Sequence, residues 1–443
     1  MYPAQPLGSP CLLQRPGRLQ QLWLELRTVP GFILLVLAST LYAGARGPGI
    51  GGFAGSGVAW IVPFSFAALC LLRPRPAVVT PLLIWAPWLA VVIANAIAAR
   101  DRAEVQRSVM FLCPMIVGFA VAACRVGPRQ LAAFLFACKV LAVLIWLAVL
   151  LRSRMVLGAA LLGWGVGGAG LAMTTALLGV LFVVEGVIGK TRSFLWWLAM
   201  VAIPTVMVTR TGIVVSMLVL PLAAAPMKWC WRLVLICVGG VLLLGAFMLP
   251  KVQEKMFFSG HGELADLRWD NPDLNTHARR AMWDAMLADI VKRPWFGYGP
   301  GAEYAWMEKM DYGGLTHPHN DWLRLLYDYG IIGVATFLFC ASVQIYHLFR
   351  IARGAVSVEV RILAYAGVTS FVALFLFMIT DNIINYPNFF GNLQFTIIGL
   401  VYAAGATAST TRADLTLSLT QVKSDRQVMN MSRRNPIGVK AMK

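Results

Sequence analysis

Long runs of apolar residues alternate with short polar stretches along most of the 443-residue chain. A run of about 20 apolar residues is the length that an α-helix needs to cross the hydrocarbon core of a bilayer. The runs are too long and too uniform for the alternating pattern of an outer-membrane barrel. The pattern therefore predicts an all-α, polytopic membrane protein with about twelve transmembrane helices. The expected spans are roughly 31–45, 57–72, 77–98, 108–124, 130–151, 155–188, 193–208, 211–227, 231–250, 322–349, 360–384 and 389–408.

The span predicted at 155–188 is long enough to contain a break, because it includes the glycine-rich stretch GWGVGGAG. A count of about thirteen spans is then possible. One long polar segment, residues 251–321, interrupts the apolar runs. It divides the chain into about nine N-terminal helices (1–250), the loop itself, about three C-terminal helices (322–410) and a basic tail (411–443). The tail lacks apolar periodicity and is expected to be disordered.

The polar loop predicts helices of its own. The first has an apolar stripe at helical spacing, which consists of Met282, Met286, Leu287 and Ile290. Pro294 should end this helix. The sequence WFGYGPG then indicates a tight turn, and residues 302–310 predict a second short helix. A loop that carries helices is more often a lid or half of a binding cavity than a passive linker.

The charge of the chain fixes its expected orientation. Only 13% of the residues are charged, yet the net charge is +18. In a soluble protein this excess would suggest nucleic acid, but here the positive-inside rule explains most of it. With a cytoplasmic N-terminus, every predicted inner loop carries Lys or Arg, and so does the tail. We therefore expect both termini in the cytoplasm and the 251–321 loop on the outer face.

Several arginines on the outer face are not explained by this rule. Arg210 lies between two apolar runs, where an arginine normally faces a cavity or an anion, and Arg152 and Arg154 follow another run. The alternative for each is snorkelling to the interface. Arg279 and Arg280 open the first loop helix, where the helix dipole is already positive. An anionic ligand would resolve that conflict, although a solvated helix start remains the alternative.

Four of the five histidines lie in the outer loop, two of them in the stretch THPHND. Asn320 or Asp321 can cap a helix that begins near Trp322, so His319 should lie just outside a helix N-terminus. The positive end of the dipole disfavours an imidazolium ring, which leaves His319 able to accept a proton. A metal site with His317 lacks a convincing ligand set, and a structural histidine pair is also possible. A general base or a hydroxyl-positioning group beside an anion site is the favoured interpretation.

These residues carry a resemblance. His319-Asn320, nine further residues and then Gly330-Ile331-Ile332-Gly333 resemble the H-[NSQ]-x9-G-x-x-G signature of bacterial O-antigen ligases. Their wider family includes O-antigen polymerases and pilin oligosaccharyltransferases. Thr209-Arg210-Thr211-Gly212 resembles the S-R-G element of the family, and Arg279 with Trp283 its R-x-x-x-W element. PWFGYGPG is similar to its P-x-x-G-x-G segment. Thr209 replaces the family's serine, and Val334 replaces a threonine often found after the second glycine.

The resemblance implies a GT-C-like membrane glycosyltransferase, metal-independent, inverting and without a cofactor, in the bacterial inner membrane with a periplasmic active site. It implies transfer of a polysaccharide from undecaprenyl pyrophosphate to a sugar hydroxyl of lipid A-core, with membrane lipids but no nucleic acid as further partners. Arg210 and Arg279 would offset charge on the departing pyrophosphate, and His319 would take or orient the hydroxyl proton. The expected substrate contacts are Arg280, Asn320, Arg152 and Arg154. His317 is expected either to contact the acceptor or to support a residue that does, and Asp381 either to contact a sugar or to cap a helix.

Other functions share parts of this pattern. An O-antigen polymerase or a protein O-oligosaccharyltransferase uses the same donor chemistry with a different acceptor. An anionic-lipid transporter or flippase would place charged residues in the middle of spans, whereas Glu185 lies toward the cytoplasmic end of its span and the other strong charges lie outside. A receptor for a polyanion would leave the histidine motif unexplained.

Overall fold

The computed structural model describes residues 29–41, 55–72, 76–99, 102–154, 168–268, 270–275, 279–310 and 317–405. Within these residues the regular structure is helical, and an isolated antiparallel bridge joins Phe257 to Leu274. The all-α fold class predicted from the apolar runs is therefore confirmed for the described part of the chain.

Each of the twelve apolar segments predicted from the sequence contains a helix. The helices of these segments are α2 (Gly31–Ser39), α3 (Gly55–Leu71), α4 (Val79–Ile97), α5 (Arg102–Ala122), α6 (Pro128–Arg154), α8 (Gly168–Ile188), α9 (Ser193–Val206), α10 (Arg210–Leu222), α11 (Trp229–Phe247), α15 (Asp321–Gly354), α16 (Val358–Thr380) and a helix at 391–405. The polar loop contributes α12 (Pro250–Met256), α13 (Arg279–Ile290) and α14 (Ala302–Met310). Short 3-10 turns lie at Pro76–Val78 (η1), Leu264–Asp266 (η2) and Ile383–Asn385 (η3).

Six of these helices are long and apolar enough to cross a membrane, so the chain has the character of a multi-pass membrane protein. A seventh candidate is the pair Trp229–Gly245 and Pro250–Met256, which is bent by 82°. The six are Pro76–Ile97, Glu104–Ala122, Pro128–Leu150, Gly168–Ile188, Asp321–Gly354 and Val358–Thr380. Ala59–Leu71, Ser193–Val206 and Arg210–Leu222 are apolar but shorter. The count of twelve spans and the orientation stay predictions, and the predicted break before Gly168 and the tail lie outside the described residues.

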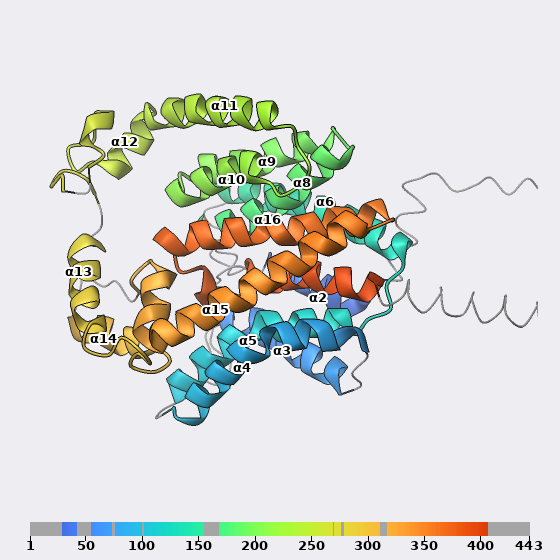
Figure 1. Ribbon diagram of the computed structural model, residues 1–443. Helices are drawn as coiled ribbons and strands as arrows, with labels where there is room; N and C mark the ends of the chain where they lie inside the picture. The colour runs from blue at the N-terminus through green and yellow to red at the C-terminus, as the bar shows by residue number, and fades with distance from the viewer. Residues whose placement is uncertain are drawn as a thin grey trace, which may run out of the picture.

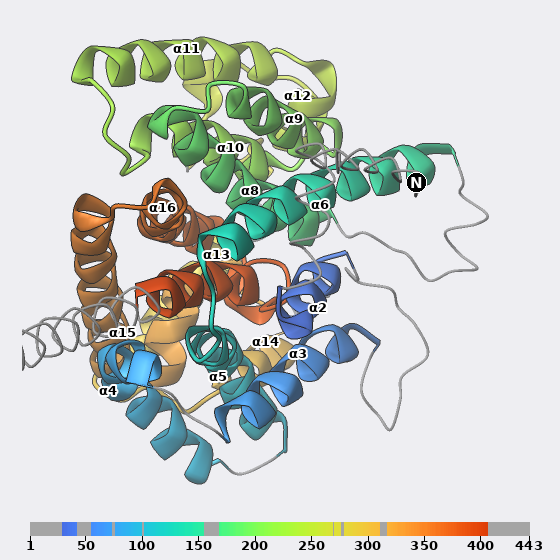
Figure 2. The same ribbon diagram turned by 90° about the vertical axis from the view of Figure 1, so that its right-hand side faces the viewer.

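The long helices run side by side, and the loop helices gather at one end of the bundle (Figure 1). α16 packs against both α15 and α8, and α8 packs against α9 and α10. On the other side, α4 contacts α5 and α15. Figure 2 shows α9, α10 and α11 at one edge and α3, α4 and α5 at the other, with α15, α16 and the red helix 391–405 between them. Residues at one end of α10, α15 and α16 can therefore share a site with the loop helices.

The loop helices pack through a small apolar core of their own. Met282, Met286 and Ile290 of α13 are buried against Trp306 and Met307 of α14 and Tyr327 of α15. The bounds predicted for α14 are confirmed. The predicted stripe was wrong in one residue: Leu287 does not belong to this core, because it is 44% exposed. Residues 282, 286 and 290 follow one line along α13, and residue 287 lies about 100° further around the helix, facing outward.

The WFGYGPG turn fits into a break in α15. Gly297, Gly299 and Gly301 all have positive φ, as expected for a tight turn. Gly330 interrupts the helical geometry of α15 with φ 66° and ψ −170°. The backbone N–H of Ile331 then donates to the Pro294 carbonyl at 2.8 Å instead of continuing the helix. The break thus ties the start of α15 to the loop.

Replacing Gly330 by alanine should destabilise the fold. A non-glycine residue in this backbone conformation costs about 1–3 kcal/mol, and a Cβ here would overlap the backbone carbon and oxygen of Trp295. We expect a lower unfolding midpoint in detergent, followed by intrinsic fluorescence. Gly354→Ala is the matched control, because nothing lies within 4 Å of its added Cβ. Equal midpoints for the two variants would contradict the expectation.

Candidate active site

His319 lies in the short connection 317–320 that leads into α15. Asn320 caps this helix, with its Oδ1 accepting from the Leu323 N–H at 3.0 Å, and this confirms the predicted cap. His319 itself has φ 50°, a left-handed conformation that few non-glycine residues adopt. The preceding Pro318 carbonyl accepts from the Trp283 indole N–H of α13 at 2.6 Å. The histidine is therefore held from both sides in an uncommon conformation, and such conformations are frequent at functional sites.

The ring of His319 faces the residues that follow α16. Its Nδ1 lies 3.8 Å from Asp381 Oδ1 and 3.4 Å from Asn382 Nδ2. The His319 side chain is 30% exposed, so one side of the ring remains open to solvent or substrate. Asp381 was expected from the sequence either to contact substrate or to cap a helix. It is the C-cap residue of α16, and it lies next to the expected catalytic histidine.

Arg210 and Arg279 come from different helices to the same end of α16. Arg210 is the first residue of α10, and its Nη1 lies 3.4 Å from the carbonyl oxygens of Lys255 and Asn275. Arg279 is the first residue of α13, and its Nη1 donates to the Thr380 carbonyl at 3.1 Å. A hydroxyl hydrogen bond of 2.8 Å between Thr211 and Thr380 also joins α10 to α16. The sequence elements around Arg210 and Arg279 thus meet beside Asp381.

The electrostatics of Arg279 reflect this convergence. Burial lowers the pKa of Arg279, the nearby charge of Arg210 lowers it further, and Asp381 partly offsets both effects. Within the described part of the chain, neither arginine has a carboxylate within ion-pair distance, and the hydrogen bonds found for both go to backbone carbonyls. Two guanidinium groups whose charges act on each other in this way favour an anion between them.

The remaining expected site residues are placed differently. The Arg280 side chain is exposed, beside Arg279 in the chain. Arg152 and Arg154 end α6, and their side chains lie outside the described residues, as does the whole of His277. The Nδ1 of His317 lies 3.5 Å from Glu303 Oε1.

A cluster of buried charges on α14 and α15 was not predicted from the sequence. Glu303 of α14 is 0% exposed and Arg324 of α15 is 1% exposed, and the atoms Oε1 and Nε of the two side chains lie 3.1 Å apart. Asp321 and Asp328 lie on the same helix as Arg324 and are also buried. The sequence does contain a signal for this cluster. Asp321, Arg324 and Asp328 are spaced by three and four residues, so they share one face of an apolar helix, and charged residues in such a helix need partners.

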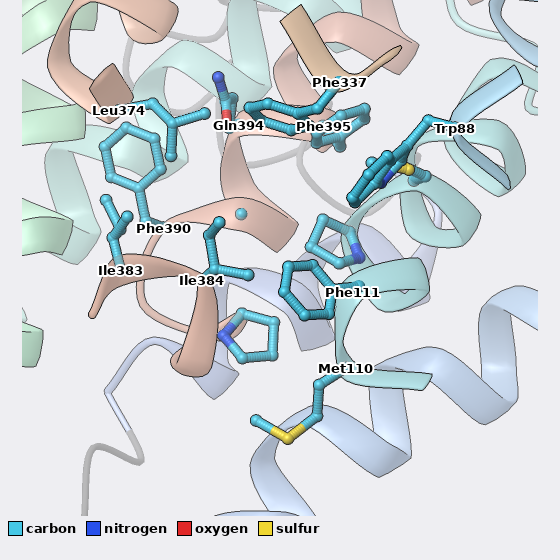
Figure 3. A pocket seen from close by; sticks show the side chains of 14 residues that line it. Trp88, Met110, Phe111, Phe337, Leu374, Ile383, Ile384, Phe390, Gln394 and Phe395 are labelled. Atoms are coloured by element: carbon cyan, nitrogen blue, oxygen red, sulfur yellow. The ribbon is translucent and has the colours of Figure 1, made fainter. Parts of the chain in front are cut away.

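An apolar cavity of about 50 Å³ lies inside the bundle, next to the segment that follows Asp381 (Figure 3). Ile383 and Ile384 form one wall, and Trp88 and Phe111 lie among the residues opposite. Its lining is almost entirely apolar, so it cannot bind a sugar or a phosphate. Arg210, Arg279 and His319 are not among the residues that line it.

The comparison with known proteins bears on the same residues. Residues 194–338 match the family model described as O-antigen ligase, and no curated protein matches the chain. The matched segment runs from α9 to the middle of α15 and includes Arg210, Arg279 and His319. This agrees with the resemblance identified from the sequence motifs. Residues 194–338 of the chain are therefore similar to the family described as O-antigen ligase.

Proposed function

We propose that the protein is an O-antigen ligase of the bacterial inner membrane with its site at the periplasmic face. It transfers a polysaccharide from undecaprenyl pyrophosphate to a sugar hydroxyl of lipid A-core. The observation that carries this proposal is the convergence of Arg210, Arg279 and His319 at the end of α16. These residues come from three separate parts of the matched segment.

The proposed reaction is a single displacement at the anomeric carbon. The acceptor hydroxyl oxygen forms the new glycosidic bond as the bond from that carbon to the pyrophosphate oxygen breaks, which inverts the configuration. The electron pair leaves with the pyrophosphate, and Arg210 and Arg279 stabilise the charge that grows there. Pyrophosphate is a good leaving group, so two guanidinium groups can serve without a divalent ion.

His319 takes the proton of the acceptor hydroxyl or orients that hydroxyl. In the neutral ring, an Nδ1–H can be directed toward the Asp381 carboxylate, 3.8 Å away. After a 180° flip of the Asn382 amide, its Oδ1, which has no other partner among the described residues, can also accept a hydrogen bond from this N–H. Nε2 is then the unprotonated nitrogen and can act as the base.

Both substrates are lipids whose head groups lie at the outer face, so the site must open sideways toward the bilayer. α13 carries Arg279, and we assign it the role of a lid over the site that admits the acceptor. Contacts of Arg280, Asn320, Arg152 and Arg154 with substrate stay predictions.

Reconstitution tests the proposal. The purified full-length chain is incubated in liposomes with an undecaprenyl-pyrophosphate-linked glycan and lipid A-core, with and without EDTA, and glycosylated lipid A-core is measured by gel mobility and mass spectrometry. We expect transfer that survives EDTA. Abolition by EDTA would show a metal requirement. Extension of the lipid-linked glycan without transfer to lipid A-core would instead identify a polymerase.

A further inference from the structure

The proposed reaction leaves one prominent feature unused, the buried charge cluster of Glu303, His317, Asp321, Arg324 and Asp328. Besides the contact of Arg324 with Glu303, Arg324 lies 3.7 Å from Asp321 Oδ1 and 3.8 Å from Asp328 Oδ2. Asp328 accepts hydrogen bonds from the backbone N–H groups of Gly301 and Glu303, both at 3.0 Å. The cluster therefore ties α14 and the glycine turn to the first two turns of α15.

The cluster also reaches both chain segments that hold His319. Upstream, Glu303 contacts His317, two residues before His319. Downstream, Asp321 Oδ2 accepts from the Ile384 N–H at 2.8 Å, and Arg324 donates to Asn385 Oδ1. Residues 384 and 385 directly follow the segment whose Asp381 and Asn382 face the His319 ring. The ring and its partners are thus anchored to one common group of charges.

The protonation states suit this anchoring. Burial alone would raise the pKa of Glu303, but the charge of Arg324 and the contact with His317 lower it to about 2, so Glu303 is a carboxylate. Burial lowers the pKa of His317, although Glu303 opposes this shift, so the ring is neutral near pH 7. A neutral His317 can donate its Nδ1–H to the Glu303 carboxylate. Buried ion pairs add little net stability to a fold. Stability alone therefore does not account for these charges.

We propose that Glu303 and His317 are positioning residues, which fix the 317–320 connection so that the His319 ring faces Asp381 and the acceptor hydroxyl. The inference rests on the proposed function, because it assigns His319 to the transfer reaction. It assigns His317 a role through the backbone rather than a contact with the acceptor sugar. The side chain of His317 is 15% exposed and directed at Glu303, which agrees with this role.

The test uses His317 variants, since removing Glu303 would leave the buried Arg324 without its nearest carboxylate and destabilise the fold. We expect His317→Ala to lower kcat about 100-fold with the donor and acceptor KM unchanged, since a misplacement of about 1 Å can have that effect. His317→Gln should restore most of kcat, because its amide can donate to Glu303. His261→Ala is the matched control, since His261 is exposed elsewhere in the loop.

A second measurement separates this inference from the proposed function. Hydrogen–deuterium exchange of peptides covering residues 317–323 should be faster in His317→Ala than in wild type, with the unfolding midpoint unchanged. Unchanged kcat, or a raised acceptor KM at constant kcat, would overturn the positioning role. If wild-type protein shows no transfer, the proposed function fails, and unchanged exchange in this peptide would then overturn the inference independently.

Discussion

Replacing His319 by alanine is expected to lower kcat for glycan transfer by about 100- to 10,000-fold, the usual contribution of a general base. The ring faces Asp381 and Asn382 through Nδ1, so we assign the contact with the acceptor hydroxyl to Nε2. Single-turnover transfer at saturating donor and acceptor measures the effect directly. Because Asn320 and Trp283 hold the connection through other atoms, the variant should remain folded.

Two further variants make this result interpretable. His319→Gln keeps a hydrogen-bonding amide but cannot take up a proton near neutral pH. A kcat for His319→Gln close to that of alanine would indicate a base, whereas substantial recovery would indicate a role in orienting the hydroxyl. His261→Ala should transfer at the wild-type rate. A His319→Ala enzyme as active as His261→Ala would remove His319 from the mechanism.

Replacing Arg279 by alanine should lower kcat by about 100- to 1,000-fold, the range found when one group that stabilises transition-state charge is removed. Its guanidinium is held by the Thr380 carbonyl at 3.1 Å, so it is already placed before the pyrophosphate departs. Arg279→Lys should be intermediate, because lysine keeps the charge but lacks the planar fork that binds two oxygens at once. The measurement is again single-turnover transfer with the lipid-linked donor.

The control for Arg279 is Arg268→Ala, which removes the same charge from an exposed position in the loop. It accounts for any general effect of the basic loop on anionic lipids. If the two variants lose equal activity, the effect belongs to the net charge of the loop and not to a site at Arg279. The double variant of Arg210 and Arg279 provides a further test. If its total loss of activity is smaller than the product of the two single losses, the two arginines act on one group.

Local features of this protein could be predicted from the sequence, because neighbouring residues determine them. The Asn320 cap, the bounds of α14 and the glycine turn all depend on a few consecutive residues. The convergence of Arg210, Arg279 and His319 could be predicted only through the resemblance to a family, since no spacing rule brings three distant segments together.

The features that escaped prediction depend on tertiary packing. Glu303 and Arg324 are 21 positions apart on two helices, and their pairing follows from the turn that folds α14 against α15. The exposure of Leu287 likewise depends on which face of α13 meets α14. The number of membrane spans also cannot be determined from the apolar runs alone. Ser193–Val206 and Arg210–Leu222 are apolar helices, but both are shorter than a typical bilayer crossing.

The hydrogen bond from the Trp283 indole to the Pro318 carbonyl has a consequence for the order of events. Trp283 lies one turn from Arg279 on α13, and Pro318 is adjacent to His319, so displacement of α13 disturbs both groups together. If α13 is the lid that we propose, the open site is inactive. A donor that has bound first would be protected from loss to water until the arrival of the second lipid allows the helix to settle.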